Sequence, residues 1–464
     1  MIERITSGSE PLDVVLGGGL PRDAIIMLVG APGSGKTILA QQWVFANATP
    51  ERPALYLTTV SEPLEKILRY GQTMSFFDQS AVGRSVYYED LGATLRDHGL
   101  RGVLERLRDL IREQQPMMIV IDSFRAMHPY ADRSSGFRRF LHDLAGMLSA
   151  VPVTTLWVGE YEEDDIARDP EFAVADAIVA LSSAQVGQRS ARALQVHKLR
   201  GGGFLAGKHA YRLSVEGLDV FPRLADAADA SSYVLSDQRV PSGVKAVDDM
   251  LEDGYWPGAS TLVAGPTGVG KTLMGLHFVF RALQLGERAV IATLQEDQYQ
   301  LERTAARFGW TLDAENLTVL YGSPVDLYVD EWVYELLATI KDTGASRVLV
   351  DSLGDLQVAA PDQARFREYL YSLLQRSSRG GTSLMMTYEV PELYDVTRLS
   401  EVTASHLADN VLLLQYAQIS KTMTRTLTVL KTRASDHDPA IREFRITPEG
   451  IGLVADGTAG RVQA

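Results

Sequence analysis

The 464-residue sequence contains no cysteine, which excludes disulfide bonds, thiolate zinc sites and cysteine nucleophiles. No apolar stretch approaches the roughly 20 residues that a membrane-spanning helix needs, and the N-terminus lacks the charged-then-apolar layout of a signal peptide. Dense runs of lysine and arginine are also missing, and the formal net charge is −14, so binding along a nucleic-acid backbone is disfavoured. These absences predict a soluble cytoplasmic protein with neither a membrane nor a nucleic acid as partner.

Hydrophobic residues make up 45% of the chain and charged residues 22%, which is typical of a globular protein. Landmarks recur at a nearly constant offset: Lys36 returns as Lys271 after 235 residues, and Asp122 returns as Asp351 after 229. Such a long period indicates a duplicated domain, because solenoid repeats are far shorter. We predict a first domain at 1–224, a small and polar linker at 225–240, and a second domain with a short C-terminal tail at 241–464.

Each half alternates short β-branched runs with helical patterns, which predicts an α/β fold with a mostly parallel, twisted sheet. The predicted strands include Ala54–Thr59, Met118–Asp122 and Thr154–Val158, with Ala289–Thr293, Arg347–Asp351 and Thr382–Thr387 as their counterparts. Late in each half, strand-like runs follow one another without long helices. We expect these runs to form a β-rich edge (Ala177–Leu181, Arg192–Lys198, Asn410–Tyr416, Thr424–Thr432).

The pattern G-x-x-x-x-G-K-[ST] occurs in full at residues 30–37 and again at 265–272. Each copy follows an apolar strand and opens a helical pattern, so its backbone N–H groups and the helix N-terminus are expected to cradle the phosphates of ATP. The predicted ATP-binding residues are Gly30, Pro32, Gly33, Ser34, Gly35, Lys36 and Thr37 in the first copy. Those of the second copy are Gly265, Thr267, Gly268, Val269, Gly270, Lys271 and Thr272.

A Mg²⁺ ion bound with ATP also needs oxygen ligands from the protein. We predict that Thr37 and Asp122 serve this ion in the first half, and that Thr272 and Asp351 serve it in the second. Both aspartates end an apolar strand, a position where an aspartate can also be a simple turn former.

These residues resemble the KaiC branch of the RecA/DnaB superfamily over nearly the whole chain, as two tandem RecA-like domains. Thr6-Ser7-Gly8 is similar to that family's opening segment, and Leu412–Tyr416 and Asp436–Phe444 are similar to the second half of KaiC almost residue for residue. The resemblance implies two-tiered hexameric rings with ATP between protomers, so a homohexamer is expected.

The same resemblance implies a role for four basic residues late in the two halves. Lys198 and Arg200, and likewise Lys431 and Arg433, match cations that KaiC presents to the γ-phosphate on a neighbouring subunit. A cation there neutralises charge that develops as the phosphoryl group leaves. Without the resemblance, an equally good interpretation is that these residues are cations at strand ends whose aliphatic side-chain stems cover apolar surface.

KaiC carries two adjacent glutamates after the second strand of each domain, which activate the attacking water or hydroxyl. Here Ser61 and Gln295 replace the first of each pair, and only Glu62 and Glu296 remain. A hydroxyl or an amide is no useful proton acceptor near neutral pH, so hydrolysis is expected to be slow or to depend on Glu62 and Glu296 alone. The competing interpretation is that both are helix-start carboxylates favoured by the helix dipole.

KaiC autophosphorylates on an adjacent Ser-Thr pair, which aligns here with Ser405-His406, with Ser400 near by. Ser405 is therefore the candidate phosphorylation site, while His406 is expected to pack or to form an interface. The sequence also ends soon after Phe444, so dependence on the tail-binding A component of the cyanobacterial clock is not expected.

Glu160 and Glu389 end matching strands, where RecA-like proteins place a polar residue that senses the γ-phosphate. They are candidate sensors, or else solvated strand-end acids.

The leading hypothesis is a KaiC-like ring ATPase that acts in timing or signalling, with ATP and Mg²⁺ as its ligands and an unknown partner protein. Three alternatives stay open: a serine/threonine autokinase of the clock type, a nucleotide-holding scaffold, and a RecA/DnaB-like motor on DNA.

Overall fold

The computed structural model describes residues 3–60, 63–131, 134–186, 189–224, 237–323, 327–360, 362–390, 403–419 and 422–454. The chain divides into two compact units, Met1–Arg223 and Leu224–Ala464. Most of the predicted linker, 225–236, lies outside the described residues. No helix in the described ranges combines the length and the apolar character needed to cross a membrane.

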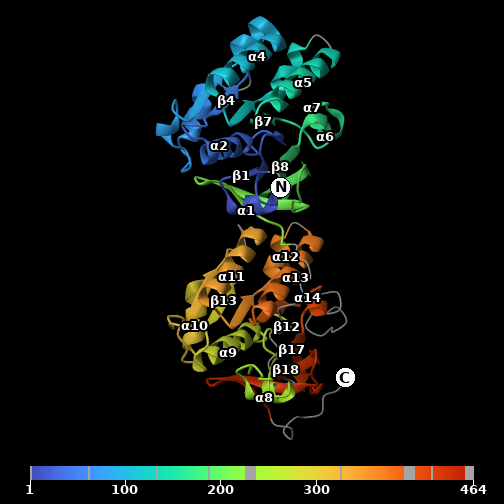
Figure 1. The fold of residues 1–464 in the computed structure, drawn as a ribbon. Helices are drawn as coiled ribbons and strands as arrows, with labels where there is room; N and C mark the ends of the chain where they lie inside the picture. Colours follow the sequence, from blue (N-terminus) through green and yellow to red (C-terminus); the bar gives the residue numbers. More distant parts are fainter. Residues whose placement is uncertain are drawn as a thin grey trace. The chain divides into compact units, whose positions relative to one another are not determined.

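Unit 1 is built on one nine-stranded sheet in the order β11-β10-β9-β8-β3-β7-β6-β4-β5 (Figure 1). Its strands are β3 (Ile25–Gly30), β4 (Ala54–Thr58), β5 (Val86–Asp90), β6 (Met118–Asp122), β7 (Thr154–Gly159), β8 (Ala177–Val186), β9 (Arg189–Leu199), β10 (Lys208–Ser214) and β11 (Gly217–Phe221). A small separate sheet joins β1 (Arg4–Ile5) to β2 (Leu20–Pro21).

The helices of unit 1 are α1 (Glu10–Val15), α2 (Lys36–Asn47), α3 (Leu64–Gly71), α4 (Gly92–Gln114), α5 (Ser134–Ser149), α6 (Asp165–Arg168) and α7 (Glu171–Val174). Two 3₁₀ helices complete the unit, η1 (Gln79–Ala81) and η2 (Phe124–Tyr130).

Unit 2 repeats the same strand order as β14-β13-β15-β16-β12-β17-β18-β19-β20, read from the opposite edge. Its strands are β12 (Ser260–Gly265), β13 (Ala289–Thr293), β14 (Leu317–Tyr321), β15 (Arg347–Asp351), β16 (Ser383–Glu389), β17 (Asn410–Ile419), β18 (Thr422–Lys431), β19 (Arg442–Thr447) and β20 (Gly450–Leu453). Its helices are α8 (Lys245–Met250), α9 (Lys271–Gln284), α10 (Gln298–Ala306), α11 (Val329–Thr343), α12 (Leu353–Ala359), α13 (Gln363–Arg379) and α14 (Thr403–Leu407).

The predicted α/β class with two RecA-like sheets is confirmed. In each unit six neighbouring strands run parallel. The last four in chain order are joined antiparallel, and they include the late strand-like runs for which a β-rich edge was predicted. A parallel sheet needs helices on both faces, and the strands that lead into the two glycine-rich loops, β3 and β12, are accordingly buried along their whole length.

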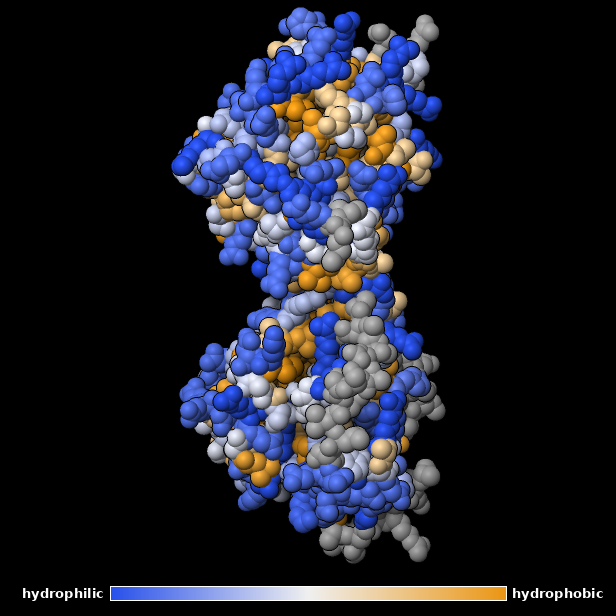
Figure 2. Space-filling model, viewed as in Figure 1, coloured by the Kyte–Doolittle hydropathy of each residue, from blue (hydrophilic) through white to orange (hydrophobic). Residues whose placement is uncertain are grey.

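Alternate residues of each central strand enter two different cores. In β3, Ile26 and Leu28 join the cluster that α2 covers, whereas Ile25 and Met27 join the cluster that α4 and α5 cover. Unit 2 repeats this, with α9 and α10 over one face and α11 to α13 over the other (Figure 1). Buried apolar residues gather in these cores. The face of the molecule drawn in Figure 2 is mostly hydrophilic, with smaller apolar areas.

Candidate functional site

Both glycine-rich loops connect a central strand to the helix that follows it. Gly35 and Gly270 are the N-cap residues of α2 and α9 and have φ of 94° and 119°, a region that side chains other than glycine rarely adopt. A Cβ on Gly30 would lie 2.2 Å from the Leu181 carbonyl oxygen. Glycine is therefore required at both ends of the loop, which brings the backbone N–H groups to the start of the helix.

The side chains between these glycines do not all face outward. Ser34 and Val269 are buried beneath their loops, so their contribution to an anion site is confined to the backbone N–H. A Cβ on Gly33 would meet no atom within 4 Å, so the loop has open space on this side. An anion can therefore approach the backbone closely there.

The lysine of each loop folds back over the loop in the same way. Lys36 Nζ donates to the Ala31 carbonyl and Lys271 Nζ to the Pro266 carbonyl, both at 2.9 Å. Burial lowers the pKa of both lysines, and the carboxylates nearest to each ammonium oppose that shift. A partly desolvated ammonium beside a glycine-rich loop is suited to a polyphosphate, whose charge would replace the missing hydration.

The threonine after each lysine contacts the aspartate predicted to share a metal with it. Thr37 Oγ1 donates to Asp122 Oδ2 at 2.9 Å, and Thr272 Oγ1 donates to Asp351 Oδ2 at 2.7 Å. A hydroxyl and a carboxylate are hard oxygen ligands of the kind that Mg²⁺ prefers. The donor set thus fits the predicted magnesium ion in both units.

Two residues that no motif in the sequence marked hold the aspartates. Tyr56 on β4 donates its hydroxyl to Asp122 Oδ2 at 2.7 Å, and Thr387 on β16 donates to Asp351 Oδ1. These contacts join neighbouring parts of the sheet that are far apart in sequence. A polar residue in an otherwise apolar buried strand was the one available signal.

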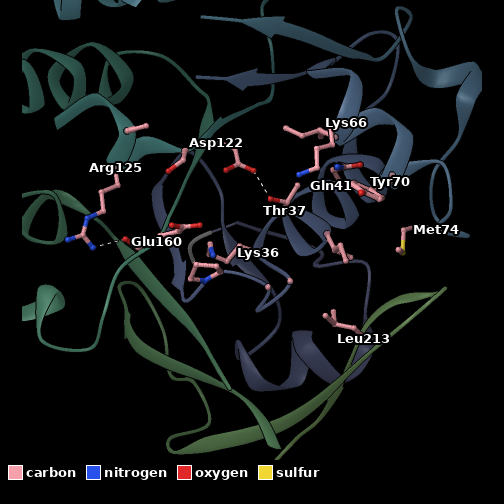
Figure 3. Close-up of a pocket in the computed structure, with 18 of the residues that line it drawn as sticks. Lys36, Thr37, Gln41, Lys66, Tyr70, Met74, Asp122, Arg125, Glu160 and Leu213 are labelled. Atoms are coloured by element: carbon pink, nitrogen blue, oxygen red, sulfur yellow. Dashed lines mark hydrogen bonds between the residues drawn. The ribbon is translucent and has the colours of Figure 1, made fainter. Parts of the chain in front are cut away.

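In unit 1 the side chains of Lys36, Thr37 and Asp122 line a cleft of about 950 Å³. Figure 3 shows the hydrogen bond between Thr37 and Asp122 inside the cleft, and Arg125 directed toward Glu160. Arg125 Nη1 donates to the Glu160 carbonyl and to Asp165 Oδ2, both at 2.6 Å. His128 lines the same cleft. Neither Arg125 nor His128 was singled out by the sequence pattern.

The two candidate sensors stand beside the loops. Glu389 lies in register with Gly265 on the neighbouring strand, and Thr267 donates a hydrogen bond to its carboxylate. Glu160 follows β7 at the equivalent place, but the residue matching Thr267 is Pro32, which has no hydroxyl to donate. Each glutamate is the main negative charge acting on the lysine of its loop.

A KaiC profile and several curated proteins match this chain. A family profile described as "ATPase: KaiC" matches residues 5–225 and 240–458. The circadian clock oscillator protein KaiC of Thermostichus vulcanus is 28% identical over 469 aligned residues, which cover 97% of this chain and 89% of that protein. KaiC 1 of Synechocystis sp. is 27% identical over 467 residues, covering 97% and 88%. The chain belongs to the KaiC family.

The four basic residues that the KaiC resemblance singled out lie away from the loops of their own units. Lys198 pairs with Ile178 on β8, whereas Leu181 on β8 pairs with Gly30. At about 3.3 Å per residue, Lys198 therefore lies roughly 10 Å along the sheet from the phosphate loop. Lys431 pairs with Val411 at the corresponding end of the unit 2 sheet. The structure does not bring these cations to the phosphate loops of their own units.

Short helices and aspartates hold these cations in place. Lys198 Nζ donates to the Phe172 carbonyl at 3.3 Å, and Lys431 Nζ donates to the carbonyls of Ser405, His406 and Ala408. Arg200 pairs with Asp176 and Arg433 with Asp409. Burial lowers the pKa of Lys198 and Lys431, and their arginine neighbours add to this.

Of the two surviving KaiC-type glutamates, Glu62 lies outside the described residues and Glu296 precedes α10. Glu296 Oε2 is buried and has no hydrogen-bond partner among the described residues. Burial, followed by the charges of Asp351 and Asp297, raises the pKa of Glu296 above its ordinary value. A carboxylate with a raised pKa and an unused oxygen has the properties of a general base.

Proposed function

We propose that the chain is a KaiC-like ring ATPase that binds Mg-ATP in both units and hydrolyses it between neighbouring subunits, in a timing or signalling role. The observation that carries the proposal is the repeated geometry of the loop lysine, the threonine and the strand-end aspartate in both units. The same contacts in both halves, each with the complete motif between a strand and a helix, favour nucleotide binding over a chance glycine-rich turn.

Each residue has a distinct role in this proposal. Lys36 and Lys271 would bind the β- and γ-phosphates, and Thr37 with Asp122 and Thr272 with Asp351 would hold Mg²⁺. Bound there, the ion supplies charge neutralisation at the phosphate oxygens. Glu62 and Glu296 would orient and deprotonate the attacking water, and Glu160 and Glu389 would sense the γ-phosphate. Assembly of several subunits is proposed because the four cations lie too far from the loops of their own units to act there, and six subunits are proposed from the likeness to KaiC.

Steady-state ATP hydrolysis by rings of confirmed size tests this proposal. Lys36→Ala is expected to abolish ATP hydrolysis by unit 1, and Lys271→Ala is expected to abolish it in unit 2. The double variant should not hydrolyse ATP, because each lysine binds the transferred phosphate. Hydrolysis that persists in the double variant would contradict the proposal. Two bound nucleotides per chain with no turnover would favour the scaffold instead.

The proposed role of the cations predicts a defect in turnover and not in affinity. Lys198→Ala, in a Lys271→Ala background, is expected to lower kcat by about 1,000-fold because γ-phosphate charge is left unneutralised. The ATP affinity of the loop should change little, since Lys198 lies at the other end of its sheet. Lys208→Ala, which removes an exposed lysine from the neighbouring strand β10, is the matched control. Equal kcat values for both variants would reduce Lys198 to a strand-end cation.

A serine autokinase is the second candidate, favoured by the place of Ser405. Its carbonyl accepts from Lys431 Nζ at 3.1 Å, so Ser405 would accompany that cation to a neighbour's nucleotide. Intact-mass analysis after incubation with Mg-ATP is expected to show one added phosphate that maps to Ser405 and is absent from Ser405→Ala. An unchanged mass would exclude the autokinase and leave the ATPase standing.

A further inference from the structure

A buried carboxylate in unit 1 plays no part in the functions described above. The Glu171 side chain is 0% exposed, and its Oε1 accepts a hydrogen bond from the Tyr161 hydroxyl at 2.6 Å and contacts His128 Nε2 at 2.8 Å. Burial alone would raise the pKa of Glu171, but the hydrogen bonds from His128 and Tyr161 outweigh it and lower that pKa. A charged carboxylate in a core is costly unless such partners hold it.

One end of this contact reaches the nucleotide cleft. His128 belongs to η2, the 3₁₀ helix that follows the strand ending in Asp122, and it lines the same cleft as Lys36 and Thr37. Its side chain is 31% exposed, while its Nε2 faces the buried Glu171. Binding or release of a nucleotide in the cleft can therefore act directly on His128, the partner of Glu171.

The other end of this contact reaches the cations Lys198 and Arg200. Glu171 is the first residue of α7, and the carbonyl of the next residue, Phe172, accepts from Lys198 Nζ. Just beyond α7, Asp176 binds the Arg200 side chain at 3.2 Å and its backbone N–H at 2.9 Å. A shift of Glu171 would thus move the backbone that holds Lys198.

Among its described residues, which omit 391–402, unit 2 holds its cations without such a contact. Asp176 and Asp409 are equivalent, because each accepts from the backbone N–H of the central strand, at Ile25 and at Ser260. Five residues before Asp409 stands Ala404, where unit 1 has Glu171.

The position matching His128 in unit 2 is Gln357, which accepts a hydrogen bond from the Tyr388 hydroxyl. Lys431 nevertheless donates to the Ser405 carbonyl, as Lys198 does to Phe172. The His128–Glu171 pair is therefore not needed to build the cation site, and its presence in unit 1 calls for another explanation.

We propose that His128 and Glu171 form a tether that makes the action of Lys198 and Arg200 on a neighbouring subunit depend on nucleotide in the chain's own unit 1 cleft. The inference rests on the proposed hydrolysis between subunits. It makes His128 and Glu171 positioning residues, and it assigns coupling between neighbours to unit 1 and not to unit 2.

Mixed rings provide the test, with Lys271→Ala in every chain so that unit 1 alone turns over ATP. Chains with Lys36→Ala have an empty unit 1 cleft but keep Lys198, and they are mixed in rising proportion with chains whose cleft is intact. When the two kinds of chain are equally abundant, the rate of ATP hydrolysis is expected to be about a quarter of the rate of rings without Lys36→Ala chains, and not half. Each active cleft then also needs a neighbouring chain whose own unit 1 cleft holds a nucleotide.

Cutting the tether should straighten this curve. Glu171→Ala introduces alanine, which unit 2 has at the matching position. In rings that carry this substitution in every chain, the rate is expected to fall in proportion to the fraction of Lys36→Ala chains. At equal amounts it should be one half of the rate of rings without Lys36→Ala chains. His128→Ala cuts the other end and should do the same, so the test survives if one variant fails to fold. Glu171→Gln keeps an acceptor for His128 and Tyr161 and should keep the curve bent.

The outcomes separate the two proposals. A straight curve for chains with the native tether, or a bent curve for both tether-cut variants, would overturn the coupling. Rings without Lys36→Ala chains that do not hydrolyse ATP in unit 1 would overturn the proposed function itself. Ring size and thermal unfolding, measured for every variant, show whether a changed curve reflects lost assembly.

Discussion

Replacement of Glu296 by glutamine is expected to lower the kcat of unit 2 by about 100- to 10,000-fold, the usual contribution of a positioned general base. The substitution preserves shape and removes the proton acceptor. The measurement is steady-state ATP hydrolysis in a Lys36→Ala background, which leaves unit 2 as the one active unit. Gln295→Ala, at the exposed neighbouring position, is the matched control and should change the rate little.

The pH dependence of that rate gives a second readout. Because the pKa of Glu296 is raised from its ordinary value of 4.5, the carboxylate is protonated as pH falls through the raised value, and the rate falls with it. This acid limb should lie above pH 4.5 and disappear in Glu296→Gln. If Glu296→Gln hydrolysed ATP as fast as its parent, Glu296 would be a helix-start carboxylate and no base.

The second large effect concerns stability and centres on Arg347, which is fully buried at the start of β15. Its guanidinium donates to both carboxylate oxygens of Glu287, at 2.9 and 3.0 Å, and to the carbonyls of Pro241 and Phe278. It thereby joins three segments of unit 2. We expect Arg347→Met to lower the free energy of unfolding of unit 2 by about 3 kcal/mol, near the low end for a broken buried ion pair, because Glu287 keeps some access to water.

Urea denaturation followed by pulsed hydrogen exchange measures this loss for each unit separately. Arg288→Met is the matched control, because Arg288 follows Glu287 in the chain and donates a hydrogen bond to the Thr343 carbonyl from an exposed position. Its effect on the free energy of unfolding should stay within about 0.5 kcal/mol. Removing both partners with Arg347→Met and Glu287→Gln should restore part of the loss, because no unpaired carboxylate is then left. Equal effects of the two arginine variants would contradict a role for the buried cation.

The pH dependence of this stabilisation has a defined sign. Burial would raise the pKa of Glu287, but the hydrogen bonds from Arg347 and Ser346 outweigh it and lower that pKa below its ordinary value of 4.5. The pair therefore contributes stability above pH 4.5 and loses it as pH falls through the lowered pKa in the folded state.

The phosphate loops and the α/β class could be predicted because their signals are local in the sequence. Lys36 and Thr37 lie within eight residues of Gly30, and apolar runs mark the buried parallel strands. The contacts of Tyr56 with Asp122 and of Glu171 with His128 could not be predicted, since sheet order and the packing of short helices decide them. Register likewise decides that Lys198 lies away from its own loop, a fact that no spacing in the sequence reveals.

The central claim is that each unit holds one Mg-ATP at its own glycine-rich loop. Equilibrium titration of the full chain with labelled ATP and Mg²⁺ tests it most directly. We expect the native chain to bind two nucleotides, Lys36→Ala and Lys271→Ala to bind one each, and the double variant to bind none. The absence of saturable uptake by the native chain, or full uptake by the double variant, would contradict it.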